Sequence, residues 1–221
     1  NITSQSFYNF VWNSPRQAGN IGLNFPDKYV FRGSLIITNT GGTNRAWRIT
    51  NLSAGQTKTI YINGDVIVNG VNAMLTATGS TSDTAAHAQI FVGGSINVSN
   101  GVLNLVAASN PYGEWFVNGD VIVSGGQIAR GGLGPWRGII TFCKTGNQLF
   151  NVQAPGTIAS PITIKVANSL SVVELGFNWP LNGILQLDNG KIVTNATNNI
   201  TVMPGVSYQL IKDLSMDRWR I

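Results

Sequence analysis

The chain has 221 residues, of which only 10% are charged, while 43% are hydrophobic and 26 are glycines. Ordinary soluble domains carry about 25% charged residues. The composition excludes helical bundles and coiled coils, which need Ala, Glu, Lys and Leu in quantity, and it excludes disorder, which goes with low hydrophobicity and high net charge.

The net charge of +5 reflects a shortage of acidic residues, 9 against 14 basic ones, and no run of Lys or Arg is present. Nucleic-acid binding needs a clustered basic stripe, so we do not expect it. The single cysteine, Cys143, excludes an internal disulfide, and the single histidine, His87, leaves no His/Cys set for zinc. We therefore expect no metal and no cofactor. The apolar runs are too short for a membrane helix, so we expect no membrane insertion.

The first thirty residues contain Pro15 and Pro26 and show no repeat. We expect residues 1–30 to form an irregular segment that leads into or caps the fold, and residues 31–221 to form the repeats. The chain starts at Asn1 rather than at a methionine, and it ends without a polar cap. We therefore expect a mature product or a fragment of a longer chain, with flanking repeats.

A glycine precedes a short apolar strand four times, at intervals of 25–31 residues. The four segments are Arg32–Ile37, Asn63–Val68, Gly93–Val98 and Asn118–Val123. Each is followed by a second corner of Gly, Asn, Ser or Thr. A period in this range is typical of solenoids, in which a strand that cannot bury its apolar face alone stacks on a copy of itself.

Two folds are compatible with these corners. Asn-Gly is a strong hairpin signal, which favours an antiparallel sandwich. However, Asn63-Gly64 and Asn69-Gly70 bracket the same strand, and that strand, Val66–Val68, is apolar throughout. Continuous apolar strands are typical of a buried parallel sheet, so we favour the solenoid.

Beyond Gly126 the pattern continues with less glycine. Further strands are predicted at Gly138–Phe142, Ile162–Val166, Gly183–Leu187 and Asn199–Val202. The predicted fold is all-β: a single-stranded parallel β-helix of about eight rungs without substantial α-helix.

Four short motifs follow one another between residues 117 and 194. They are Val117–Gly126, Gly138–Phe150, Ile162–Gly176 and Gly183–Thr194. In this order they resemble the repeats of adhesin-like β-helical proteins that Bacteroidota secrete through the type IX pathway. Residues 178–181, Asn-Trp-Pro-Leu, depart from the family pattern.

The resemblance implies a location outside the cell or on the bacterial surface, with roles in adhesion or contact with polymers. It also implies secretion or attachment proteins as partners. Asp83-Thr84-Ala85 matches the short acceptor motif of Bacteroidota O-glycosylation. Thr84 is therefore the candidate glycosylation site, which would make the chain a glycoprotein.

Asp65 and Asp120 are candidates for a catalytic pair of carboxylates, because they occupy equivalent places in two repeats with Ser95 between them. We expect these three residues to form a column, with the carboxylates two rungs, about 9.6 Å, apart. Inverting glycosidases separate their carboxylates by roughly 6.5–9.5 Å. The alternative is that each Asp is a turn residue bonded to neighbouring backbone, and we favour it. No catalytic residue is assigned.

Ligand contact is expected from tryptophans beside arginines, because an aromatic face suits a sugar ring and a guanidinium holds hydroxyls or acidic groups. The candidates are Trp136 with Arg137, in a loop rich in Gly and Pro, and Trp47 with Arg45 and Arg48. Trp115 and Trp179 are weaker candidates. The alternative for each ring is packing at the edge of the core.

Together these observations predict a non-enzymatic extracellular module that binds surfaces or polysaccharide through loops on a rigid solenoid. One alternative is a carbohydrate-active β-helix, a polysaccharide lyase or hydrolase. A second is a type IX secretion substrate held in a larger assembly.

Overall fold

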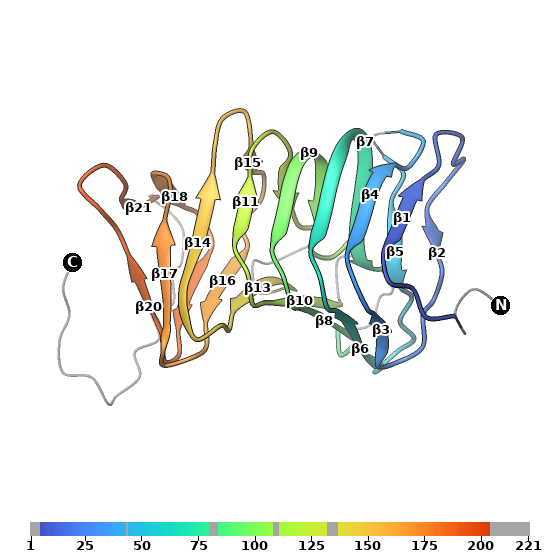
Figure 1. Cartoon of the computed structure of the whole chain (residues 1–221), viewed down its shortest axis with the longest axis horizontal. Coiled ribbons are helices and arrows are strands. Elements are labelled where there is room, and N and C mark those ends of the chain that lie inside the picture. The colour runs from blue at the N-terminus through green and yellow to red at the C-terminus, as the bar shows by residue number, and fades with distance from the viewer. Residues whose placement is uncertain (1–4, 43, 80–83, 108–110, 132–136, 204–221) are drawn as a thin grey trace.

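The computed structural model describes residues 5–42, 44–79, 84–107, 111–131 and 137–203. In these residues the protein is all-β, with no α-helix and with long parallel sheets. The strands lie side by side along the long axis of the molecule (Figure 1). Every strand pair is parallel, which excludes the antiparallel sandwich and is consistent with a solenoid.

Sheet A has twelve strands, eight of which form one continuous path. That path is β1 (Phe10–Asn13), β4 (Leu35–Asn39), β7 (Val66–Thr78), β9 (Ile96–Asn104), β11 (Val121–Val123), β14 (Gly146–Val152), β17 (Ser171–Leu175) and β20 (Lys191–Val193). The other four strands are β2 (Ile21–Gly22), β5 (Trp47–Thr50), β12 (Gln127–Ala129) and β15 (Thr157–Ile158).

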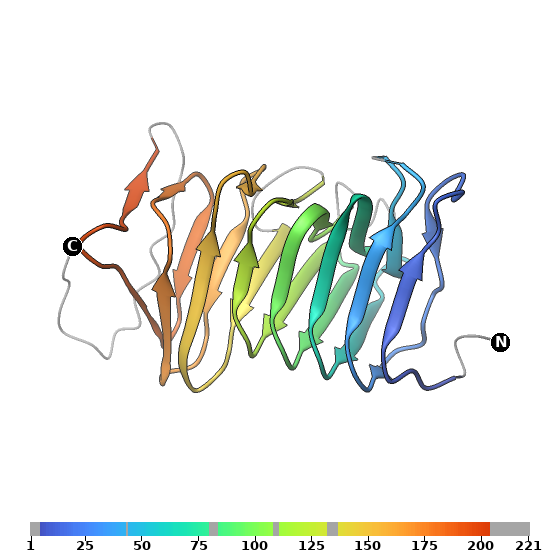
Figure 2. The ribbon, with the colours of Figure 1, turned by 45° about the horizontal axis from the view of Figure 1, so that its top comes forward.

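Sheet B has seven strands and lies behind sheet A in the tilted view (Figure 2). Its strands are β3 (Tyr29–Phe31), β6 (Thr57–Ile62), β8 (His87–Val92), β10 (Tyr112–Val117), β13 (Gly138–Phe142), β16 (Thr163–Val166) and β19 (Ile184–Leu187). A third, two-stranded sheet pairs β18 (Trp179–Leu181) with β21 (Ile200–Val202).

The eight strands predicted from the sequence do not form one column. The first four overlap β4, β7, β9 and β11 of sheet A, the next three overlap β13, β16 and β19 of sheet B, and the last overlaps β21. Counting predicted strands therefore does not give the number of coils, because one circuit of the chain contributes to more than one sheet.

Residues 10–13 and 21–22, expected in an irregular segment, form β1 and β2 and pair in register with β4 and β5. These strands form because their apolar side chains pack into the core. The rings of Phe10 and Trp12 belong to a cluster that also contains Phe25, Phe31 and Trp47. This aromatic cluster fills the N-terminal end of the stack.

Strand alternation builds one core between the sheets. Val66 and Val68 are fully buried while Ile67 between them is partly exposed, and Val121 and Val123 repeat the pattern. The core-facing residues are in register from one coil to the next, so Val66 stacks on Ile96 and Ile96 on Val121. Each strand is thereby sheltered by its neighbours.

Candidate functional site: the outer face of sheet B

The outer face of sheet B carries a row of aromatic side chains. Tyr61, Phe91 and Phe116 come from β6, β8 and β10, and each pairs in register with the next. Alternation places them outward, because Ile60, Ile62 and their equivalents fill the core. We call Tyr61, Phe91 and Phe116 the aromatic row.

The rings of the aromatic row stack on one another. Phe91 and Phe116 are nearly parallel, 5° apart with centroids 4.4 Å apart, and Tyr61 stacks on Phe91 at 5.2 Å and 26°. Because the ring faces cover each other, the row presents mainly ring edges to solvent. Tyr61 has 37% of its surface exposed.

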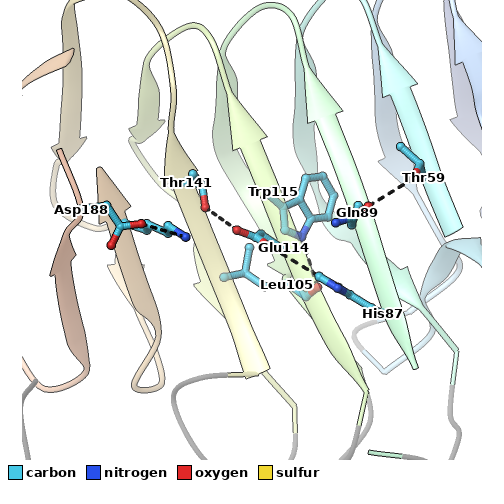
Figure 3. Close-up of polar contacts among 9 residues, drawn as sticks. Thr59, His87, Gln89, Leu105, Glu114, Trp115, Thr141 and Asp188 are labelled. Atoms are coloured by element: carbon cyan, nitrogen blue, oxygen red, sulfur yellow. Dashed lines mark hydrogen bonds and ion pairs between the residues drawn. The ribbon is translucent and has the colours of Figure 1, made fainter. Parts of the chain in front are cut away.

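A polar row, Thr59, Gln89 and Glu114, runs beside the aromatic row and is also in register. The Thr59 hydroxyl donates to Gln89 Oε1 at 3.3 Å. Glu114 Oε1 accepts from the Thr141 hydroxyl at 2.8 Å, and Glu114 Oε2 lies 3.5 Å from His87 Nε2. These side chains, labelled in Figure 3, link strands β6, β8, β10 and β13 across the face.

Glu114 is only 9% exposed although it lies on the outer side of the sheet. Burial raises the pKa of its carboxyl, but hydrogen bonding by His87 and Thr141 and the charge of Lys165 lower it more, so the pKa lies below its ordinary value. Glu114 is therefore held as a carboxylate. A general acid needs the opposite shift.

Toward β19 the same face becomes charged. Lys165 of β16 pairs with Asp188 at 3.0 Å, and Gln186 donates to Asp188 at 2.7 Å. Lys165 continues the line of the aromatic row, because it is in register with Thr141 and Thr141 with Phe116. The face thus runs from apolar to charged along the stack.

Arg137 stacks on an aromatic ring of this face. Its guanidinium carbon lies 4.5 Å from the centre of the Tyr112 ring, and Nη1 donates to the Thr84 carbonyl at 3.1 Å. Tyr112 in turn lies 5.8 Å from the His87 ring. Arg137 is therefore placed on the candidate face, while Trp136, its expected partner, lies outside the described residues.

Trp47 is fully buried, which corrects its assignment as a ligand platform. Its ring stacks against Phe10 at 5.2 Å and is part of the N-terminal aromatic cluster. Trp47 has arginines on both sides in the sequence, at 45 and 48, but alternation in β5 turns its ring inward. Trp115 and Trp179 are also buried; Trp115 Nε1 donates to the Leu105 carbonyl at 3.2 Å.

Arg45 and Arg48 lie apart from the face of sheet B. Arg45 Nη1 donates to the carbonyls of Gln17 and Gly41, so it fastens the corner before β5. Arg48 is on β5, in register with Thr76 of β7. Its Nε is buried without a hydrogen-bond partner among the described residues.

The expected column of Asp65, Ser95 and Asp120 is present, and its oxygens are bound to backbone. Asp65 Oδ1 accepts from the Ser95 amide at 2.7 Å, and Ser95 Oγ accepts from the Asp120 amide at 3.0 Å. Asp120 Oδ1 accepts from the Leu149 amide at 2.8 Å. These contacts agree with the alternative that each Asp is a turn residue hydrogen-bonded to neighbouring backbone. The column therefore links successive coils.

His87 is the first residue of β8, so it lies on a strand of sheet B. Cys143 follows β13, and its Sγ contacts the Val117 carbonyl at 3.5 Å. Burial raises the pKa of this thiol, which disfavours the reactive thiolate. Within the described ranges, no group of three His, Cys, Asp or Glu residues could hold a metal.

The aromatic row and Glu114 were not identified from the sequence. Tyr61, Phe91 and Phe116 are separated by 30 and 25 positions, close to the repeat period, and this spacing is the signal that could have found them. Thr59, Gln89 and Glu114 have the same spacing, 30 and 25 positions, but His87 and Thr141 meet Glu114 only through the pairing of strands in sheet B.

Comparisons with protein-family models, curated proteins and solved structures find no match to this chain. No helix long and apolar enough to cross a membrane occurs in the described part of the chain.

Proposed function

We propose that the chain is a single-stranded parallel β-helix of about eight rungs that serves as a non-enzymatic extracellular module of a bacterial surface or secreted protein. Its role is structural and adhesive, and it binds polysaccharide or a similar surface polymer. The all-parallel pairing and the eight-strand path of sheet A support the architecture.

The aromatic row is the observation that carries the binding role. It runs along the stack beside a hydrogen-bonding row, so a linear polymer lying along the axis would contact both. Ring edges carry partial positive charge and attract hydroxyl oxygens. The Tyr61 side chain and the amide of Gln89 add polar groups of the kind that sugars bind.

The described carboxylates support binding rather than hydrolysis. Glycoside hydrolysis needs two carboxyl groups, one to give a proton and one to act as base or nucleophile. Asp65 and Asp120 accept backbone amides, and Glu114 is fixed by Thr141 and His87. None of these three groups is arranged as a facing pair.

The test is retention on insoluble polysaccharides of defined composition, with Phe91→Ser and Phe116→Ser as variants. Each should weaken binding roughly tenfold, the equivalent of about one aromatic contact. Ile122→Ser, on the outer side of sheet A, is the matched control and should bind as the wild type does. Equal loss in the control, or no retention of the wild type, would contradict the proposal. Release of reducing ends would instead favour the hydrolase.

We also propose Thr84 as an O-glycan acceptor. Its exposure supports this, because the residue lies in a turn before β8. Glycopeptide mass spectrometry after expression in a Bacteroidota host should find a glycan on Thr84 that Thr84→Ala removes. A bare peptide would count against it.

A further inference from the structure

Lys58 occupies a core-facing position of β6. The strand alternates so that Lys58, Ile60 and Ile62 point inward, and Lys58 is only 6% exposed. Its Nζ lies 2.5 Å from Asn24 Oδ1 and 3.3 Å from the Phe25 carbonyl. Neither of the two ion pairs found among the described residues includes Lys58.

An ammonium group buried without a paired carboxylate is unfavourable. Burial accordingly lowers the pKa of Lys58, and the charge of Asp27 opposes this only in part. A desolvated lysine with a lowered pKa has more of the neutral amine, which is the nucleophilic form.

The segment that carries Asn24 is fixed against β6. Phe25 is fully buried, with its ring 4.4 Å from Tyr29 and 5.0 Å from Phe31. On the other side, Asp27 Oδ1 accepts from the Thr59 amide at 2.7 Å, so the segment is bonded to the residue beside Lys58. Asn24 itself has a φ of 49°, a left-handed conformation that few residues adopt without such support.

This geometry holds an amine against a carboxamide, with a carboxylate in the same segment. When two reactants are held in contact, their reaction becomes an intramolecular step. The effective concentration of one group at the other is then very high, which raises the reaction rate. The usual obstacle to aminolysis of an amide is the poor leaving group, and protonation of the departing nitrogen by water, which reaches the exposed Asn24, removes part of it.

We propose that Lys58 Nζ and Asn24 Cγ join in an intramolecular amide bond. Water takes a proton from the Lys58 ammonium, and the Nζ lone pair then attacks Asn24 Cγ. The Cγ–Nδ2 bond breaks as Nδ2 is protonated. Nζ loses a second proton, one hydrogen remains on the new amide, and ammonium leaves. Ammonium plus carboxamide thus gives secondary amide plus ammonium, with charge balanced and no oxidant or reductant needed.

The bond joins two residues 34 positions apart and closes the first circuit of the chain. It also fixes the segment that contains Asn24 and Phe25 to β6, so this segment cannot detach from the N-terminal aromatic cluster. Such a tie suits a stalk under mechanical load, but it does not depend on polysaccharide binding, so either proposal can fail alone.

Intact-mass measurement of the denatured full chain tests the bond. The wild type should weigh less than its sequence by one ammonia molecule. Tryptic digestion should yield a branched peptide that contains both Asn24 and Lys58, with no cleavage after Lys58. A full-length mass with separate linear peptides, after prolonged incubation of the folded protein, would overturn the proposal.

Variants separate this bond from other losses of ammonia, such as cyclisation of an asparagine. Lys58→Met and Asn24→Ala should each restore the full mass expected for the variant, whereas Lys165→Met, a lysine ion-paired on sheet B, should keep the deficit. If Lys58→Met does not fold, the exposed Asn24 still allows Asn24→Ala. A deficit that survives both substitutions would also overturn the proposal.

Discussion

Corner glycines make room for side-chain oxygens that bridge successive coils. A Cβ on Gly94 would lie 2.2 Å from Asp65 Oδ1, which crosses the glycine to accept from the Ser95 amide at 2.7 Å. Gly64 and Gly119 have the same relation to Ser34 and Ser95. The Gly-Asp and Gly-Ser pairs of the sequence therefore have one shared role. The glycine leaves room for a side-chain oxygen from the preceding coil, and the Asp or Ser after it supplies the oxygen that bonds to the following coil.

Gly94→Ala should therefore destabilise the protein by about 1–3 kcal/mol, since it displaces the Asp65 carboxylate and leaves an amide unbonded. Chemical denaturation followed by circular dichroism measures this. Gly19→Ala is the control, because a Cβ there meets nothing within 4 Å, and it should stay within about 0.5 kcal/mol of the wild type. Equal stability of the two variants would contradict the role of the corner glycines.

The Glu114 carboxylate predicts that the free energy of unfolding depends on pH. Its pKa lies below its ordinary value of 4.5, so its contribution to stability is present above that value and is lost as pH falls through the lower, folded pKa. Glu114→Gln should remove this contribution. The wild type should be more stable than the variant at pH 5.5, and the difference should shrink as the pH falls below 4.5.

Unfolding curves at several pH values between 3 and 5.5 would show this convergence. Glu174→Gln, which alters an exposed carboxylate on β17 of sheet A, is the comparison. A difference between wild type and Glu114→Gln that does not change with pH would mean that the carboxylate contributes packing only.

At the scale of the strand, the aromatic row predicts coupling between neighbouring coils. A double-mutant cycle of Phe91→Ala and Phe116→Ala should give an interaction of about 0.5–1.5 kcal/mol, because the rings stack at 4.4 Å. The pair Tyr61→Ala and Phe116→Ala should be additive within about 0.5 kcal/mol, since Phe91 separates them. Additivity in both cycles would show that the rings act independently.

The strands were predictable where glycine corners repeat. The sequence placed the starts of β4, β7, β9 and β11 within three residues, because the corner and the apolar alternation act locally. It did not show that β7 continues to Thr78 through a bend and there pairs with β5. Such a continuation depends on neighbouring coils, which local patterns do not describe.

The candidate face was less predictable than the strands, because its side chains meet only through register. Thr141 and Glu114 are 27 positions apart and His87 and Glu114 likewise, and each contact requires the pairing of strands in sheet B. Gln148 shows the same limit. It is buried and donates to the Val117 carbonyl at 3.0 Å, a contact that nothing in its own segment indicates.

At the scale of the whole molecule, stability is expected to vary along the stack. Stacked repeats contact mainly their neighbours, so each coil depends on those beside it. The N-terminal end is filled by the aromatic cluster, and the middle of sheet A pairs β7 with β9 over a long register. Toward the other end, β20 and β21 contain no buried residue, and Val202 is 46% exposed.

Hydrogen exchange should follow this gradient. Amides of β9 should exchange at least about a hundredfold more slowly than those of β21, because β21 belongs to a two-stranded sheet and opens locally without disturbing the core. Exchange of the full chain, read by mass spectrometry of peptides from each strand, measures it. Leu103→Ala, a core change in β9, should speed exchange in β7 and β12, which pair with it at Leu75 and Ile128, while leaving β21 nearly unchanged. Uniform protection along the chain would mean that the stack unfolds as one cooperative unit. It would contradict the expectation that the stability of each coil depends mainly on its neighbours.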